Sequence, residues 1–189
     1  MQTSKSNLLL FGAVMACFLS CGPGNKDSKD IAKEENEAKL EDTDIEKDAK
    51  FAVAAADGGI LEVQLGQLAQ TNAASATVKQ FGQTMVDDHT KANEELKALA
   101  GTKNISLPAA LSDKNQKAYD DLAKKTGADF DKAYSTFMVD DHKEDIEEFK
   151  KEAEKGNDPE IKTWASGKVA TLEHHLEMAK RAEDESKGK

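Results

Sequence analysis

Apolar residues recur three and four positions apart along most of the chain, which is the spacing of one face of an α-helix. Four long stretches carry this pattern. They begin near Thr43, Ser75, Ala128 and Pro159, and end near Thr71, Gly101, Lys155 and Glu183. A shorter amphipathic stretch runs from about Ser112 to Thr126, between the second and third long stretches. The pattern therefore predicts an all-α protein with four long helices and one extra short helix.

Capping and stop residues stand at several of the expected helix ends. Thr43 and Glu46 have the spacing of a capping box, and Ser75 is a candidate N-cap. Gly101 and Gly156 predict the ends of two long helices. The first and second long helices, and the third and fourth, are joined by tight connections, whereas a long connection joins the second to the third. This pattern is typical of a four-helix bundle with one crossover, as in ferritin-like folds. A plain up-and-down bundle with a decorated loop is the alternative.

The first residues, MQTSKSNLLLFGAVMACFLSC, have the pattern of a secretory signal. Lys5 precedes an apolar run, Leu8–Leu19, that is shorter than the roughly 20 residues of a membrane-spanning helix. The segment FLSCG resembles a bacterial lipobox, which predicts a signal peptide over residues 1–20 and acylation of Cys21. Cys17 is a competing match, but cleavage before it would leave two bulky apolar residues in the mature tail. We expect an exported protein whose lipid anchor holds it on an envelope membrane, in the periplasm or at the outer membrane.

The next segment is rich in charge and poor in large apolar residues. Gly22–Lys50 carries six lysines and ten acidic residues. Such a composition buries too little surface to offset the entropy lost on ordering. We expect residues 21–43 to form a disordered acidic tether with at most transient helix, and residues 44–185 to form the folded domain.

Composition narrows the class of protein further. Only 5% of the residues are aromatic while 33% are charged, which favours helices over a sandwich or barrel. The net charge of −10 repels phosphate backbones, so we expect no nucleic-acid partner. Cleavage before Cys21 would leave no free thiol, which excludes disulfides and thiol catalysis. Protein partners cannot be inferred from these features.

One pentapeptide, Met-Val-Asp-Asp-His, occurs twice, at Met85–His89 and at Met138–His142. Each copy lies near the middle of a predicted long helix, so His89 and His142 should lie at similar depth. Both histidines also fall on or beside the apolar stripe of their helix. The repeat therefore predicts two imidazoles that face each other inside the bundle.

The two other long helices offer one matching side chain each. His175 lies nearer the apolar face of the last helix than its neighbour His174, and Glu62 is the one acid that interrupts the stripe of the first helix. The expected inward-facing set is Glu62, His89, His142 and His175, with Asp88 and Asp141 beside them. Imidazole and carboxylate groups are suitable ligands for Zn, Fe, Mn, Ni or Cu, so a divalent transition metal is a possible cofactor.

Two interpretations of this set stay open. Buried histidines and carboxylates also satisfy one another by hydrogen bonding, without any ligand. The carboxylate-bridged di-iron pattern needs Glu-x-x-His on two helices. The residues three positions before the three histidines are Val86, Val139 and Leu172. The sequence thus favours a single-ion site or a purely structural polar cluster over a di-iron centre.

Several motifs are distributed over Phe51–Ala182. They include Gly58-Gly59-x-x-Glu62, Leu65-Gly66-x-Leu68-Ala69, Met85-Val86-Asp87-Asp88-His89, Met138-Val139-x-Asp141-His142, Asp158-Pro159-x-Ile161 and His175-Leu176. Together they resemble the exported bacterial family catalogued as domain of unknown function 4142. The resemblance implies a ferritin-like helical bundle and export to the periplasm or outer membrane. It implies no established activity or cofactor.

Three functions are compatible with these features. The leading hypothesis is a non-enzymatic envelope lipoprotein whose helical bundle binds a metal or small ligand in a stress or storage role. A metal-dependent redox enzyme that uses the interior glutamate and histidines is the second. The third is a structural module for protein interaction, which predicts an exposed apolar patch.

Overall fold

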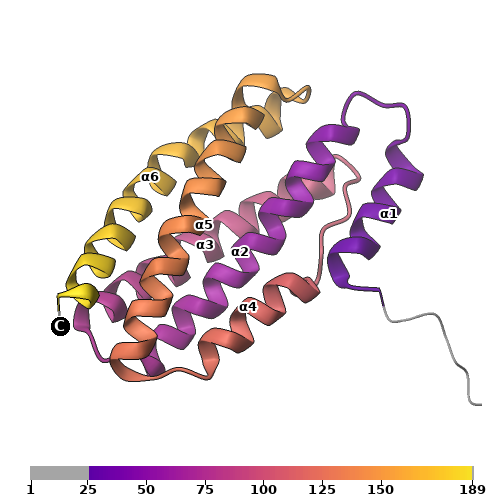
Figure 1. Cartoon of the computed structure of the whole chain (residues 1–189). Coiled ribbons are helices and arrows are strands. Elements are labelled where there is room, and N and C mark those ends of the chain that lie inside the picture. Colours follow the sequence, from indigo (N-terminus) through magenta and orange to yellow (C-terminus); the bar gives the residue numbers. More distant parts are fainter. Residues whose placement is uncertain (1–25, 189) are drawn as a thin grey trace, which may run out of the picture.

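The computed structural model describes residues 26–188, so the predicted signal peptide, Cys17 and Cys21 lie outside the described residues. Between residues 26 and 188 the protein is all-helical, with no strand (Figure 1). The helices are α1 Ser28–Leu40, α2 Glu46–Asn72, α3 Ala76–Thr102, α4 Asp113–Ala123, α5 Gly127–Lys155 and α6 Pro159–Lys187. The predicted all-α class is confirmed. None of the described helices has both the length and the apolarity needed to cross a bilayer.

The four long helices lie side by side (Figure 1). The most extensive contacts join α2 to α3 and α5 to α6, while α3 also packs on α6 and α2 on α5. Ala73, in the α2–α3 turn, forms an isolated bridge with Gly127 at the start of α5. Because α5 begins at the end of the molecule where α3 begins, these two helices run in the same direction. The connection through α4 therefore crosses the length of the helices.

Two buried aspartates tie the helical hairpins to each other at opposite ends. Asp131 of α5 accepts hydrogen bonds from two backbone N–H groups of the α2–α3 turn, at 2.9 and 3.1 Å. Asp48 of α2 accepts hydrogen bonds from the backbone N–H groups of Asn157 and Asp158 in the α5–α6 turn, with three N···O distances of 2.6 to 3.1 Å. Ser75 occupies the predicted N-cap position of α3, but its side chain makes no cap hydrogen bond. The backbone N–H of Ser75 donates to the carboxylate of Asp131.

The remaining helix ends differ in part from the prediction. The capping box of Thr43 and Glu46 is wrong, because the Thr43 hydroxyl donates to the carbonyl of Leu40 at 2.6 Å and α2 begins without a side-chain cap. Gly101 does not end α3, which continues to its C-cap at Lys103. Gly156 is the C-cap of α5, as predicted.

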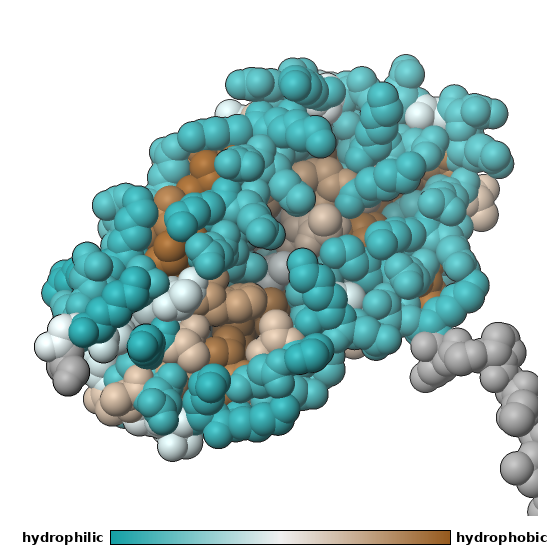
Figure 2. All heavy atoms as spheres, viewed as in Figure 1, coloured by the Kyte–Doolittle hydropathy of each residue, from teal (hydrophilic) through white to brown (hydrophobic). Residues whose placement is uncertain are grey.

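Apolar side chains fill the interior at both ends of the helices and leave a polar level between them. One cluster, toward the α2–α3 turn, is built around Phe81, Tyr134 and Met138. The clusters toward the α5–α6 turn are built around Leu96, Ile161, Phe149 and Leu172. On the face seen in Figure 2 hydrophilic residues cover most of the surface, and apolar residues are visible between the helices.

Helices α2 and α3 approach each other closely at a pair of glycines. A Cβ atom on Gly66 would lie 2.5 Å from the carbonyl oxygen of Gly82. A Cβ atom on Gly82 would lie 2.6 Å from the Cβ atom of Ala69. These distances are too short for a side chain at either position. The two glycines therefore set how near α2 and α3 lie on one side of the polar level.

Helix α1 lies in the segment that was predicted to be a disordered tether, residues 21–43. Residues 28–40 form a helix that packs against α2, with Ala32 and Leu40 buried. The buried Asn36 donates from Nδ2 to the carbonyl of Ser106 at 2.8 Å and accepts from the Ser106 N–H at 2.7 Å. The expectation of disorder is wrong here because it rested on the scarcity of large apolar residues. Polar contacts to a distant backbone hold this helix instead.

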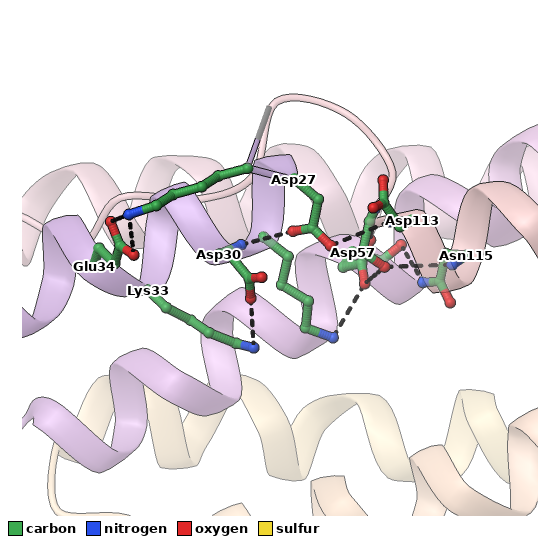
Figure 3. Close-up of polar contacts among 10 residues, drawn as sticks. Asp27, Asp30, Lys33, Glu34, Asp57, Asp113 and Asn115 are labelled. Atoms are coloured by element: carbon green, nitrogen blue, oxygen red, sulfur yellow. Dashed lines mark hydrogen bonds and ion pairs between the residues drawn. The ribbon is translucent and has the colours of Figure 1, made fainter. Parts of the chain in front are cut away.

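The start of α1 is bound to the segment before α4 (Figure 3). Asp27 caps α1 by accepting from a backbone N–H at 2.8 Å and also accepts from the N–H of Asp113 at 3.2 Å. Lys29 forms an ion pair of 3.1 Å with the buried Asp57 of α2. Asp57 accepts in addition from the backbone and the hydroxyl of Ser112, each at 2.8 Å. Helix α1 is thus part of the folded domain.

We predict that Asn36→Ala destabilises the protein by about 1–3 kcal/mol, because it leaves the half-buried N–H and C=O of Ser106 without the side chain that they bind. Urea unfolding followed by circular dichroism measures the change. The matched control is Glu37→Ala, on the exposed face of α1, which should stay within about 0.5 kcal/mol of the parent protein. Equal stability of the two variants would show that α1 does not contribute to the fold.

Candidate metal centre

The structure brings the four predicted side chains together from the four long helices. Glu62 of α2, His89 of α3, His142 of α5 and His175 of α6 are 2%, 7%, 0% and 1% exposed, respectively. The three imidazole rings are 5.3 to 5.9 Å apart between centroids. All four groups therefore share one buried level of the helices.

The local sequence explains why these side chains reach the same level. On α3, His89 stands between Met85, in the apolar cluster at one end, and Leu96, in the cluster at the other. On α5, His142 stands in the same way between Met138 and Ile146. Each helix continues its apolar stripe on both sides and interrupts it once, so packing of the stripes aligns the interruptions.

Hydrogen bonds hold one ring nitrogen of His142 and of His175 and leave the other free. His142 Nδ1 lies 3.1 Å from the carbonyl oxygen of Met138, which only accepts, so Nδ1 carries the proton. His175 Nε2 lies 2.8 Å from Oδ2 of Asp88, whose carboxylate accepts in the same way. The opposite nitrogens, His142 Nε2 and His175 Nδ1, are buried without a hydrogen-bond partner. Both rings thus present a lone pair to the interior.

The third imidazole is paired with the glutamate. His89 Nδ1 lies 2.7 Å from Glu62 Oε2, and His89 Nε2 has no partner. The other oxygen, Glu62 Oε1, makes no hydrogen bond and lies 3.5 Å from His142 Nε2. When Glu62 is ionised it accepts from the Nδ1–H of His89, which places the lone pair of this ring on Nε2 as well.

Atoms that could bind a metal lie close together in this cluster. One ring nitrogen from each of the three histidines lies within 4.8 Å of the other two, and one atom each of Glu62, Asp141 and His142 meets the same limit. Eight buried side-chain nitrogen or oxygen atoms lack a partner in the described part of the chain. Six of them belong to Glu62, His89, Tyr134, Asp141, His142 and His175. Such atoms are rare in folded proteins, where ordered water, an ion or another ligand usually satisfies them.

The two aspartates predicted beside the histidines occupy different positions. The side chain of Asp88 is 46% exposed and holds His175 from the outer side. Asp141 is turned inward, and its Oδ2 is buried without a partner. Two further residues of α5 were not predicted to belong to the site: Asp145, one helical turn beyond Asp141, and Tyr134, two turns before His142. Their spacing of four and eight residues along α5 was the available signal.

Burial favours the neutral form of every ionisable group in this cluster. Desolvation raises the pKa of Glu62, Asp141 and Asp145 well above the usual range of a carboxyl group. Desolvation also lowers the pKa of His89 to about 4. The pKa of His142 is well below its usual value for the same reason, with the neighbouring imidazoles adding to the effect.

A cavity of about 120 Å³ adjoins the cluster. Glu62, His89 and His175 line it, and Gly58 and Trp164 are among its other lining residues. Two of the three imidazoles are therefore next to open space.

An all-helical protein with a buried cluster of three histidines and a carboxylate is the class that this fold and site define. The profile of the family described as "Domain of unknown function (DUF4142)" matches residues 32–182, and the chain belongs to this family. The match begins inside α1. No curated protein and no solved structure gives a significant match.

We predict that the imidazoles of His89 and His175 stay neutral in the metal-free protein from about pH 7 to pH 5, because burial lowers the pKa of each ring to about 4. The unfolded chain takes up protons first, so these rings reduce stability as the pH falls from about 6.5 to about 4. The buried acids, whose pKa values are raised, act in the opposite direction, so melting curves do not isolate the effect.

Nitrogen-15 NMR of the imidazoles measures it directly, with His89→Ala and His175→Ala samples to assign the signals. Titration of either ring near pH 6.5, the value for a solvated imidazole, would contradict the prediction.

Proposed function

We propose that this protein is a lipid-anchored protein of the bacterial cell envelope that binds one transition-metal ion through His89, His142 and His175, with Glu62 as the neighbouring carboxylate. The observation that carries the proposal is the arrangement of the imidazoles. Each ring is hydrogen-bonded at one nitrogen, and its other nitrogen is buried and free. Metal-bound histidines have this pattern, because a partner on the far nitrogen fixes the tautomer and the ring orientation.

The donor set favours a single ion. His142 has only Nε2 to offer, because Nδ1 donates to the carbonyl of Met138. The histidine triad and the triad of Glu62, Asp141 and His142 therefore compete for one nitrogen. Three imidazoles with one or two carboxylates suit Zn, Fe, Mn, Ni or Cu, and suit Mg or Ca poorly. Such an ion would supply positive charge to a cluster that burial otherwise keeps neutral.

The fold supports the proposal by analogy. Parallel central helices with a single crossover are the arrangement of ferritin-like four-helix bundles, which bind metal between facing helices. We assign this protein to that architecture, with α1 and α4 as additions. It differs from the di-iron members in having Val86, Val139 and Leu172 where a Glu-x-x-His motif would place its carboxylate.

The proposed location rests on the sequence of the N-terminal segment. Acylation of Cys21 would anchor the chain, since each buried methylene of an acyl chain contributes about 0.8 kcal/mol to membrane binding. The net charge of −10 agrees with a soluble domain that attracts cations rather than nucleic acid. Periplasm and outer membrane are the compartments we propose.

Storage or stress protection and redox catalysis are both functions of metal proteins of this kind. The cavity beside His89 and His175 favours redox catalysis, because a metal in contact with open space can bind a further ligand. An interaction module has less support. Among residues 26–188, Ile31 is the one exposed large hydrophobic residue, at 46%.

We expect the full mature chain, purified without chelator and loaded with Zn, Fe, Mn, Ni or Cu in turn, to bind about one ion per molecule. Elemental analysis after gel filtration measures the ratio. The His89→Ala/His142→Ala double variant should lose the ion, whereas His174→Ala, at an exposed neighbour of His175, should keep it. Absence of metal from the parent protein under all five conditions would leave the cluster as a structural hydrogen-bond network.

We also expect Asp88→Ala to weaken metal binding by about 10–100-fold while the stoichiometry stays at one, because the partner on the far nitrogen of His175 is lost. Competition with a chelator of known affinity measures this change. Asp87→Ala is the matched control, since Asp87 is the exposed neighbour of Asp88 in the same pentapeptide. Equal affinity of the two variants would contradict the role given to Asp88.

A further inference from the structure

The cavity beside the histidine cluster has a mixed lining. Glu62, His89 and His175 belong to it and lie where the proposed ion would bind. Phe149 and Trp164 also line the cavity and add apolar surface. His142 does not line the cavity, so the cluster is closed behind this ring and open in front of the other two.

Two consecutive glycines of α2 lie at this cavity and have opposite surroundings. A Cβ atom on Gly59 would lie 2.1 Å from Oδ1 of Asn93, so Gly59 is packed tightly against α3. A Cβ atom on Gly58 would meet nothing within 4 Å, although Gly58 lines the cavity and is only partly exposed. The space beside Gly58 therefore belongs to the cavity, and a Cβ atom at this position would enter it without displacing a neighbour.

We infer that the proposed metal centre is an open one: the cavity between Gly58, His89 and His175 admits a small oxygen- or nitrogen-donor ligand to a coordination position that the protein leaves vacant. This inference rests on the proposed metal binding and adds the ligand class. Structural metal sites are closed by four protein ligands, whereas reactive sites keep a position for water or substrate.

The cavity has room for a small ligand. A water molecule takes up about 30 Å³ in the liquid, and a cavity of about 120 Å³ can therefore hold several non-hydrogen atoms. Water, hydroxide, peroxide and similar small ligands fit. The charged lining groups offset one another in part, since Asp88 and Asp145 are accompanied by Lys91 and Lys168. The lining thus gives a small polar ligand no strong electrostatic barrier.

The experiment uses cobalt(II) as the metal and azide as the probe ligand, on the full mature chain. Visible absorption of the cobalt-loaded protein reports both the binding of cobalt and the change of its coordination by azide. Gly58→Leu fills the space beside the cluster. Gly167→Leu is the matched control, because Gly167 also lies inside a helix with nothing within 4 Å but is exposed and away from the cavity. Both changes replace a glycine by a better helix former, which favours folding.

We expect the parent protein and Gly167→Leu to bind cobalt and then azide. Gly58→Leu should bind cobalt equally well and azide at least about tenfold more weakly, a loss of about 1.4 kcal/mol. Gly58→Ala, with a smaller side chain, should bind azide with an affinity between those of the parent protein and Gly58→Leu. This variant provides the measurement if leucine disturbs cobalt binding.

Two results would overturn the inference while the metal proposal stands. In one, cobalt binds but azide leaves the spectrum of the parent protein unchanged. In the other, Gly58→Leu and Gly58→Ala bind azide as tightly as Gly167→Leu does. If the parent protein binds neither cobalt nor any of the five ions named above, the metal proposal itself fails and the open coordination position fails with it.

Discussion

The arrangement of the helices depends on the burial of four polar side chains at one level between apolar layers. An imidazole or carboxylate removed from water is destabilising unless it finds a hydrogen-bond partner. The carbonyl of Met138, the carboxylate of Asp88 and the pairing of Glu62 with His89 supply a partner for part of each group. A shift of one helix along its axis would break these contacts, so the polar level fixes the register of α2, α3, α5 and α6.

Much of this could be predicted from the sequence. The period of the apolar residues gives the long helices, because packing against neighbours requires one continuous apolar stripe on each. The level of His89, His142 and His175 follows from the same stripes, since a polar residue inside an apolar stripe has to lie inside the molecule. Glu62 could be found in the same way. These predictions depend only on the position of a residue along its own helix.

Features that depend on contacts between distant segments could not be predicted. The two copies of the pentapeptide are identical, yet Asp88 lies at the surface beside His175 and Asp141 is turned inward, because each helix has different neighbours. Helix α1 has few large apolar residues, and Asn36 reaches a backbone 70 positions away. The backbone N–H groups of Ala74 and Ser75, in the turn before α3, are satisfied by Asp131 of α5. Local periodicity contains no information about such partners.

The position of Trp164 has an optical consequence. It is the only tryptophan in the chain, and it lines the cavity beside the histidines, with its ring 5.5 Å from that of Phe149. Intrinsic tryptophan fluorescence of this protein therefore originates from a single fluorophore in the wall of the cavity. Its emission reports the polarity and occupancy of that one place, without an average over the rest of the molecule.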